Sequence, residues 1–118
     1  LLDEFTYLID TPYDNTDPNA WRCVVDRPPG GSVSSISLIN INHFLNKMIG
    51  TIGLPDPVDA ANTNGANLVQ HLQQCKTAFG RIANFISVDF STKGDVFGAV
   101  AALNGLPPKR KVKTKRHR

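Results

Sequence analysis

Two short apolar stretches decide the fold: Ser35–Ile41 has the sequence SISLINI, and Phe85–Phe90 has the sequence FISVDF. Both are rich in β-branched residues, and the first follows the run Asp26–Gly31, whose two prolines and two glycines exclude a helix. The apolar run at the end of Ser35–Ile41 is nearly continuous, as expected for a strand that is covered on both faces. We therefore predict two strands of a buried parallel sheet.

Helical patterns follow both stretches. The longest is expected over Asn64–Phe79, where apolar side chains recur with the 3.6-residue period of a helix, and Gly80 ends it. A short helix is also expected after Asn42. Its apolar stripe would be Phe44, Leu45, Met48 and Ile49.

A third helix follows the second strand, with Asp95 as its N-cap and Asn104-Gly105 as its end. This alternation of strands and helices predicts an α/β fold with parallel strands. Because two strands do not make a stable sheet, further strands are expected in the first 30 residues or outside this chain.

The charge of the chain is unevenly distributed. The 118 residues contain 13 Lys and Arg against 10 Asp and Glu, a net charge of +3, but seven of the basic residues lie in segment 109–118. Residues 1–108 therefore carry −4 and the basic segment 109–118 carries +7. The segment is suited to nucleic acid, anionic lipid or an import receptor, although it has no aromatic residue for base stacking, and a solvated end is the alternative.

Asp89 is the acid best placed for chemistry, because it follows an apolar strand at the edge where α/β proteins build their active sites. The alternative is that it caps the following loop by binding its backbone amides. Asn42 and His43 come at the equivalent point after the first strand and are candidates for binding a polar ligand, or else are structural. His71 flanks the apolar face of the long helix.

Established motifs for other chemistry are absent from the sequence. Ser87 lacks the glycines of a nucleophile elbow, and Gly30-Gly31 lacks the Lys and Ser or Thr of a phosphate loop. No zinc or calcium motif is present, so we predict neither a metal nor a cofactor. Cys23 and Cys75 are the two cysteines, and the residues alone leave a disulfide and two buried thiols equally open. No apolar run reaches the roughly 18 residues of a transmembrane helix.

An ordered series of motifs resembles the C-terminal part of the fungal phospholipase C-like phosphodiesterases, relatives of phosphatidylinositol-specific phospholipase C. The series comprises Leu2–Phe5, Thr11–Tyr13, Cys23–Pro28, Asn42–Leu45, Asn84–Phe90, Gly94–Phe97 and Leu103–Gly105. It covers residues 1–106, and the basic tail 107–118 has no counterpart. The start at Leu1, without a signal peptide, is read as that of a piece of a longer protein.

The resemblance implies a TIM-type (β/α)8 barrel, of which this chain would be the last units, since eight units need about 250 residues. It also implies cleavage of a phosphodiester by two histidines acting as base and acid, with an arginine stabilising the phosphate charge. No residue here matches those histidines. Asp89 matches an aspartate that supports a catalytic histidine. Asn42 and His43 match a family motif to which the resemblance assigns no role, and we expect them to line the substrate pocket.

The resemblance further implies secretion, and with it a disulfide between Cys23 and Cys75. The chain is therefore expected to be an inactive fragment of a secreted phosphodiester hydrolase acting on a phospholipid headgroup. The rival hypothesis is a non-catalytic interaction protein whose basic tail binds anionic partners; specific nucleic-acid recognition is not expected.

Overall fold

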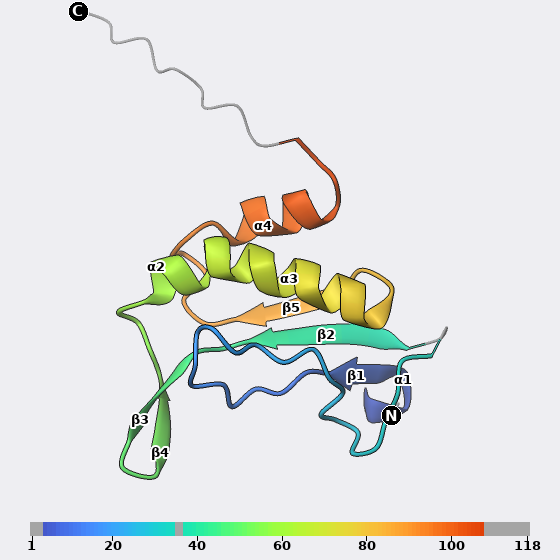
Figure 1. The fold of residues 1–118 in the computed structure, drawn as a ribbon, viewed down its shortest axis with the longest axis horizontal. Coiled ribbons are helices and arrows are strands. Elements are labelled where there is room, and N and C mark those ends of the chain that lie inside the picture. The colour runs from blue at the N-terminus through green and yellow to red at the C-terminus, as the bar shows by residue number, and fades with distance from the viewer. Residues whose placement is uncertain (1–3, 35–36, 108–118) are drawn as a thin grey trace, which may run out of the picture.

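The computed structural model describes residues 4–34 and 37–107, and its centre is a three-stranded parallel sheet (Figure 1). Strand β2 (Leu38–His43) lies between β1 (Leu8–Asp10) and β5 (Phe85–Val88). Leu8 pairs with Leu38, and Asn40 pairs with Phe85. The predicted start of β2 at Ser35 and the basic segment 109–118 lie outside the described residues.

Helices cover one face of this sheet. Helix α3 (Ala66–Phe79) lies over the sheet, and α4 (Val96–Leu103) packs on the side of α3 that is turned away from the strands (Figure 1). As predicted, α3 ends at Gly80, which takes the left-handed conformation with φ 74°, and Asp95 caps α4 by accepting a hydrogen bond of 3.0 Å from Gly98 N–H. Two single-turn helices, α1 (Glu4–Tyr7) and α2 (Ala60–Thr63), complete the helical elements of the described residues.

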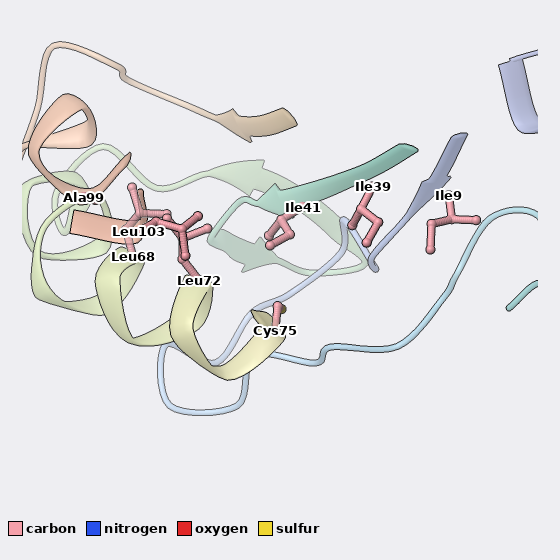
Figure 2. Packing of buried hydrophobic residues seen from close by; sticks show 8 residues of the cluster. All are labelled: Ile9, Ile39, Ile41, Leu68, Leu72, Cys75, Ala99 and Leu103. Atoms are coloured by element: carbon pink, nitrogen blue, oxygen red, sulfur yellow. The ribbon is translucent and has the colours of Figure 1, made fainter. Parts of the chain in front are cut away.

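The core lies between the sheet and α3 and continues between α3 and α4 (Figure 2). Its buried members are Ile9, Ile39, Ile41, Leu68, Leu72, Cys75, Ala99 and Leu103. Ile39 and Ile41 are two residues apart, so they point to the same face of β2 and meet α3 there. The intervening residues of β2 must therefore face the opposite side.

A disulfide between Cys23 and Cys75 ties the long β1–β2 connection to α3. This is the pairing that the family resemblance implies. It holds the connection beside the sheet, although that connection contains no regular element among its described residues.

The expectation that the chain forms the last units of a TIM-type barrel is wrong. The described strands form a small open sheet, with β1 and β5 as its edges, and no helix stands between β1 and β2 in the described residues. A closed barrel needs eight strands, each followed by a helix. The chain is instead a small α/β domain with helices on one face.

The expectation of a short helix after Asn42 is also wrong. Residues Asn46–Ile49 (β3) and Ile52–Pro55 (β4) form an antiparallel hairpin in which Ile49 pairs with Ile52. The hairpin turns through Gly50-Thr51, and Gly50 has the positive φ of 63° that two-residue hairpin loops require. The turn residues therefore override the helix-like spacing of the apolar side chains.

The loop between β5 and α4 is docked closely on the turn between α2 and α3. Gly94 has φ 70°, and a Cβ atom at this position would lie 2.7 Å from the carbonyl carbon of Asn64 and 2.8 Å from the carbonyl oxygen of Ala61. The N–H of Asp95 donates to the same Asn64 carbonyl at 3.1 Å. A side chain at position 94 would therefore push this loop away from α2.

We predict that Gly94→Ala destabilises the protein by at least about 2 kcal/mol more than Gly50→Ala. Gly50 is the matched control, because it also has a positive φ but has no atom within 4 Å of its would-be Cβ, so only the backbone cost of about 1–2 kcal/mol applies there. The measurement is the free energy of unfolding in urea. Equal destabilisation by the two substitutions would contradict the close packing at Gly94.

Candidate functional site

Two polar clusters lie on opposite faces of β2. His43 is 1% exposed and belongs to the helix-covered face, whereas its neighbour Asn42 is 4% exposed and faces the other side. The two residues that the sequence groups as pocket lining are therefore separated by the sheet. Each residue has its own set of hydrogen-bond partners.

On the helix-covered face, His43, His71 and Trp21 form a buried stack. The rings of Trp21 and His43 are 4.1 Å apart between centroids with an angle of 26° between their planes, and those of Trp21 and His71 are 4.9 Å apart. The Trp21 Nε1–H donates to Asn67 Oδ1, which fixes the indole against α3. All three side chains are buried.

The hydrogen bonds of this stack determine the tautomer of each imidazole. His43 Nε2 lies 2.6 Å from the carbonyl oxygen of Thr63, so it must carry the proton. The Nδ1 of neutral His43 is then an acceptor, and the Nδ1–H of His71 donates to it at 2.8 Å. His71 Nε2 is left as a buried lone pair without a partner among the described residues.

Both histidines are held in the neutral form. Burial lowers the pKa of His43 to about 4, against a smaller opposite effect of the hydrogen bond to Thr63. Burial, and then the neighbouring His43, lower the pKa of His71 to about 3. Both rings are also 1% exposed, and they are hydrogen-bonded to each other, so neither imidazole is accessible to a substrate.

On the open face of the sheet, polar side chains form a continuous ladder across the three strands. Asn42 Nδ2 donates to the Asp10 carboxylate at 3.1 Å and to the Thr11 carbonyl at 2.8 Å. Asn40 Nδ2 donates to Asn42 Oδ1, and Ser87 Oγ donates to Asn40 Oδ1, both at 2.9 Å. The oxygen and both N–H groups of the Asn42 amide are thus hydrogen-bonded, which makes Asn42 a residue that positions its neighbours.

Arg27 completes the ladder at its exposed end. Its Nε and Nη2 groups donate to the two carboxylate oxygens of Asp10, whose side chain is 2% exposed, while the Arg27 side chain is 44% exposed. The guanidinium carbon also lies 5.1 Å from the ring centroids of both Phe5 and Tyr13. The hydrogen bond to Asp10 raises the pKa of Arg27, so this cation is permanent and fixed in place.

Asp89 lies just beyond the end of β5, as predicted. Its backbone carbonyl accepts a hydrogen bond of 2.7 Å from Asn64 Nδ2. With His43, it lines a cavity of about 10 Å³, which has room for one water at most. Within the described residues its carboxylate has no hydrogen-bond partner, so the supporting role of Asp89 stays a prediction.

The described residues contain one cluster with the ligand types of a metal site. A ring nitrogen of His71 and the sulfur atoms of Cys23 and Cys75 lie within 4.8 Å of one another. The two sulfurs are joined in the disulfide and are not thiolates, which are the form that binds metals. In this form the cluster offers a single imidazole ligand.

Sequence reasoning missed Asp10, Asn40 and Arg27 as members of a site. The alternation of Asn40 and Asn42 with Ile39 and Ile41 is the signal that could have found the polar face, because a two-residue period places both amides on one side. Nothing in the sequence signals the pairing of Arg27 with Asp10, which are 17 residues apart.

We predict that lowering the pH from about 6.5 to about 4.5 destabilises the protein through the two histidines. The unfolded chain takes up protons at its histidines near pH 6.5, whereas the folded chain does so only near pH 4 and below. The unfolding free energy is therefore highest above pH 6.5 and decreases by about 2 kcal/mol per histidine over this range. The fluorescence of Trp21, the single tryptophan, reports the transition.

The matched variant is His71→Gln, which keeps a side-chain N–H for His43 but does not titrate. Its unfolding free energy should decrease by about half as much over the same pH range. An unchanged pH dependence in this variant would contradict the assignment.

A protein-family model described as PI-PLC X 1 matches residues 1–104. "PI-PLC X domain-containing protein 1" of Arthroderma benhamiae is 38% identical over 110 residues, which are 90% of this chain and 36% of that protein. An "Uncharacterized secreted protein" of the same fungus is 34% identical over 120 residues, covering 90% of this chain and 27% of that protein. No solved structure matches the chain.

The chain therefore spans well under half the length of these curated relatives. The resemblance to fungal phospholipase C-like proteins is confirmed, because the family model covers nearly the whole sequence and the relatives are fungal. This chain belongs to the PI-PLC X domain family.

Proposed function

We propose that the chain forms part of a secreted phospholipase C-like phosphodiester hydrolase, and that Arg27 on the open face of the sheet binds the phosphate of its substrate. The observation that carries the proposal is the fixed and half-exposed guanidinium of Arg27, which is held by Asp10 and lies close to the rings of Phe5 and Tyr13. A planar guanidinium matches the geometry of phosphate oxygens, to which it can donate two parallel hydrogen bonds.

The hydrogen-bonding capacity of Arg27 supports this role. In the described part of the chain, Asp10 takes two of the five N–H donors of the guanidinium and leaves three for an anion. Asp10 is itself held by Asn42 Nδ2, so the whole pair is positioned by the central strand. A preorganised donor of this kind loses little entropy when a phosphate binds.

Proton transfer is assigned to residues outside the described segment. The family relation suggests a base and an acid that are both histidines, but His43 and His71 are buried, neutral and bonded to each other. We infer that the catalytic histidines belong to the rest of a protein as long as the relatives. Asp89 would then orient one of them through a hydrogen bond, which fixes its tautomer and stabilises its protonated form.

Two observations support the proposal that the protein is secreted. A relative carries the description "secreted" in its name, and Cys23 and Cys75 form a disulfide, a bond that persists in oxidising compartments. No helix within residues 4–34 and 37–107 is both long and apolar enough to cross a bilayer.

The first test is binding of glycerophosphoinositol, a soluble phosphodiester, to the 118-residue chain by calorimetry. Arg27→Lys should weaken binding about tenfold or more, because lysine cannot reproduce the bidentate geometry. Arg22→Lys is the matched control, since Arg22 also pairs with an aspartate, Asp14, but lies exposed and away from the ladder. Equal affinities of the wild type and Arg27→Lys would contradict the assignment.

The second test concerns hydrolysis. The isolated chain should not cleave phosphatidylinositol or a glycerophosphodiester, because the two histidines in its described residues are buried and unavailable to a substrate. Release of the phosphorylated headgroup is the measurement. Hydrolysis by the 118-residue chain that Asp89→Asn abolishes would show that the chemistry resides in this segment after all.

A further inference from the structure

The small cavity beside Asp89 is lined by residues whose buried oxygen atoms lack hydrogen-bond partners. These atoms are Thr63 Oγ1 and Asn64 Oδ1, which have no partner within the described residues. Thr63 is 5% exposed and Asn64 is 1% exposed. A buried polar atom without a partner destabilises a fold unless a ligand satisfies it, so these two oxygens point to an occupant of the cavity.

Two carboxylates line the same cavity. Asp56 follows β4, where its N–H donates to the Leu45 carbonyl at 3.0 Å, and Asp89 follows β5. Asp56 Oδ1 accepts a hydrogen bond of 3.0 Å from Val58 N–H, which leaves its second oxygen for a ligand. No Lys or Arg stands among the described residues that line the cavity, and His43 is neutral. Two negative charges therefore lie around one small space without a countercharge from these residues.

Asn64 is held in this group by its amide nitrogen. Nδ2 donates to the backbone carbonyls of Asp89 and Phe90 at 2.7 and 3.1 Å. Because both of these partners are acceptors, the amide cannot be turned over, and the unpartnered atom must be the acceptor Oδ1. The loop after β5 therefore preorganises the Asn64 oxygen.

The chemistry of these groups favours a cation over a water molecule. The cavity volume of about 10 Å³ admits one small occupant. The two carboxylates and the Asn64 oxygen are acceptors only. A water molecule has two protons to donate, so it would leave an acceptor unpaired and both negative charges uncompensated. A divalent cation would bind these oxygens together and neutralise both charges.

We propose that this cavity binds a calcium ion through the side-chain oxygens of Asp56, Asp89, Asn64 and Thr63. Ca²⁺ takes about six to eight oxygen ligands in a flexible geometry, and carboxylates and amide carbonyls are typical of them. Water can supply the remaining ligands, because Asp56 and Asp89 are only half-buried.

The ligands come from separate parts of the chain. Asp56 follows the β3–β4 hairpin, Thr63 and Asn64 stand at the end of α2, and Asp89 follows β5. A bound ion would therefore tie the hairpin and α2 to the edge of the sheet. Such a site forms no continuous calcium motif, and for that reason the search of the sequence for motifs missed it. Unlike the cluster of Cys23, His71 and Cys75, it consists of oxygen atoms alone.

This inference goes beyond the proposed phosphate binding. His43 lines the cavity from the helix-covered face of β2, whereas Arg27 lies on the open face. Arg27→Lys should therefore bind calcium as the wild type does, and calcium binding and glycerophosphoinositol binding can fail independently of each other. Asp56 is the principal residue for the test, because Asp89 also has a role in the proposed hydrolysis.

The experiment is a calorimetric titration of calcium chloride into the full 118-residue chain after its metals have been removed with EDTA. We expect one site with a dissociation constant of about 0.1–1 mM, because the ion has only two charged ligands. Asp56→Asn and Asp89→Asn should each weaken binding about tenfold or more, since each removes one negative charge. Magnesium should bind about tenfold more weakly than calcium, because it requires a near-ideal octahedral site and releases its waters reluctantly.

A second measurement is the midpoint of thermal unfolding. Calcium chloride should raise it in the wild type relative to sodium chloride of the same ionic strength, because the ion binds the folded chain. The double variant Asp56→Asn/Asp89→Asn should show no such rise, and circular dichroism should show that every variant is folded.

Glu4→Gln is the matched control. It makes the same change from carboxylate to amide at an exposed position of α1, which lies at the other end of the sheet from α2 (Figure 1). Its affinity for calcium should equal that of the wild type. Absence of both a binding heat and a thermal shift would overturn the proposal and leave a water molecule as the occupant. Calcium binding that the double variant retains would overturn it as well, because the ion would then be held elsewhere, and equal affinities for magnesium and calcium would overturn the choice of ion.

Discussion

The pairing of β2 with a parallel strand on each edge is the constraint on which the other features depend. Hydrogen bonds to β1 and β5 hold β2 extended, and an extended strand must alternate its side chains between two faces. Ile39 and Ile41 are thereby committed to the core beneath α3, and Asn40 and Asn42 to the opposite face. A shift of one residue in the register would exchange the two sets, burying amides in the core and exposing isoleucines.

The polar ladder forms because Asn40 and Asn42 lie on the face of β2 that is turned away from α3. Asp10 is almost completely buried, and a buried carboxylate is stable only when it is paired and hydrogen-bonded. Arg27 and Asn42 provide these contacts, so the ladder contributes to the fold while it holds a cation half-exposed at its end. On the other face, the stack of His43, His71 and Trp21 buries no charge, because both imidazoles are neutral.

Local signals predicted much of the secondary structure. The long helix α3, its end at Gly80, the strand β5 and the Asp95 cap of α4 all depend on residues within a few positions of one another. The β3–β4 hairpin escaped prediction because the spacing of its apolar residues also fits a helix, and the turn at Gly50 decided between the two. The barrel expectation came from the family resemblance and not from local signals, and the open sheet overturns it.

The sequence by itself determined the parallel α/β character, the positions of most helix ends, the separation of charge between the body and segment 109–118, and the family relationship. Only the tertiary structure decided that Arg27 binds Asp10, that His43 is hydrogen-bonded to His71, and that Asn42 and His43 lie on opposite faces of β2. The physical reason is the separation along the chain of the residues that interact. Periodicity and capping act between residues a few positions apart, whereas these contacts join segments that strand pairing and helix packing bring together from 17 to 28 positions away.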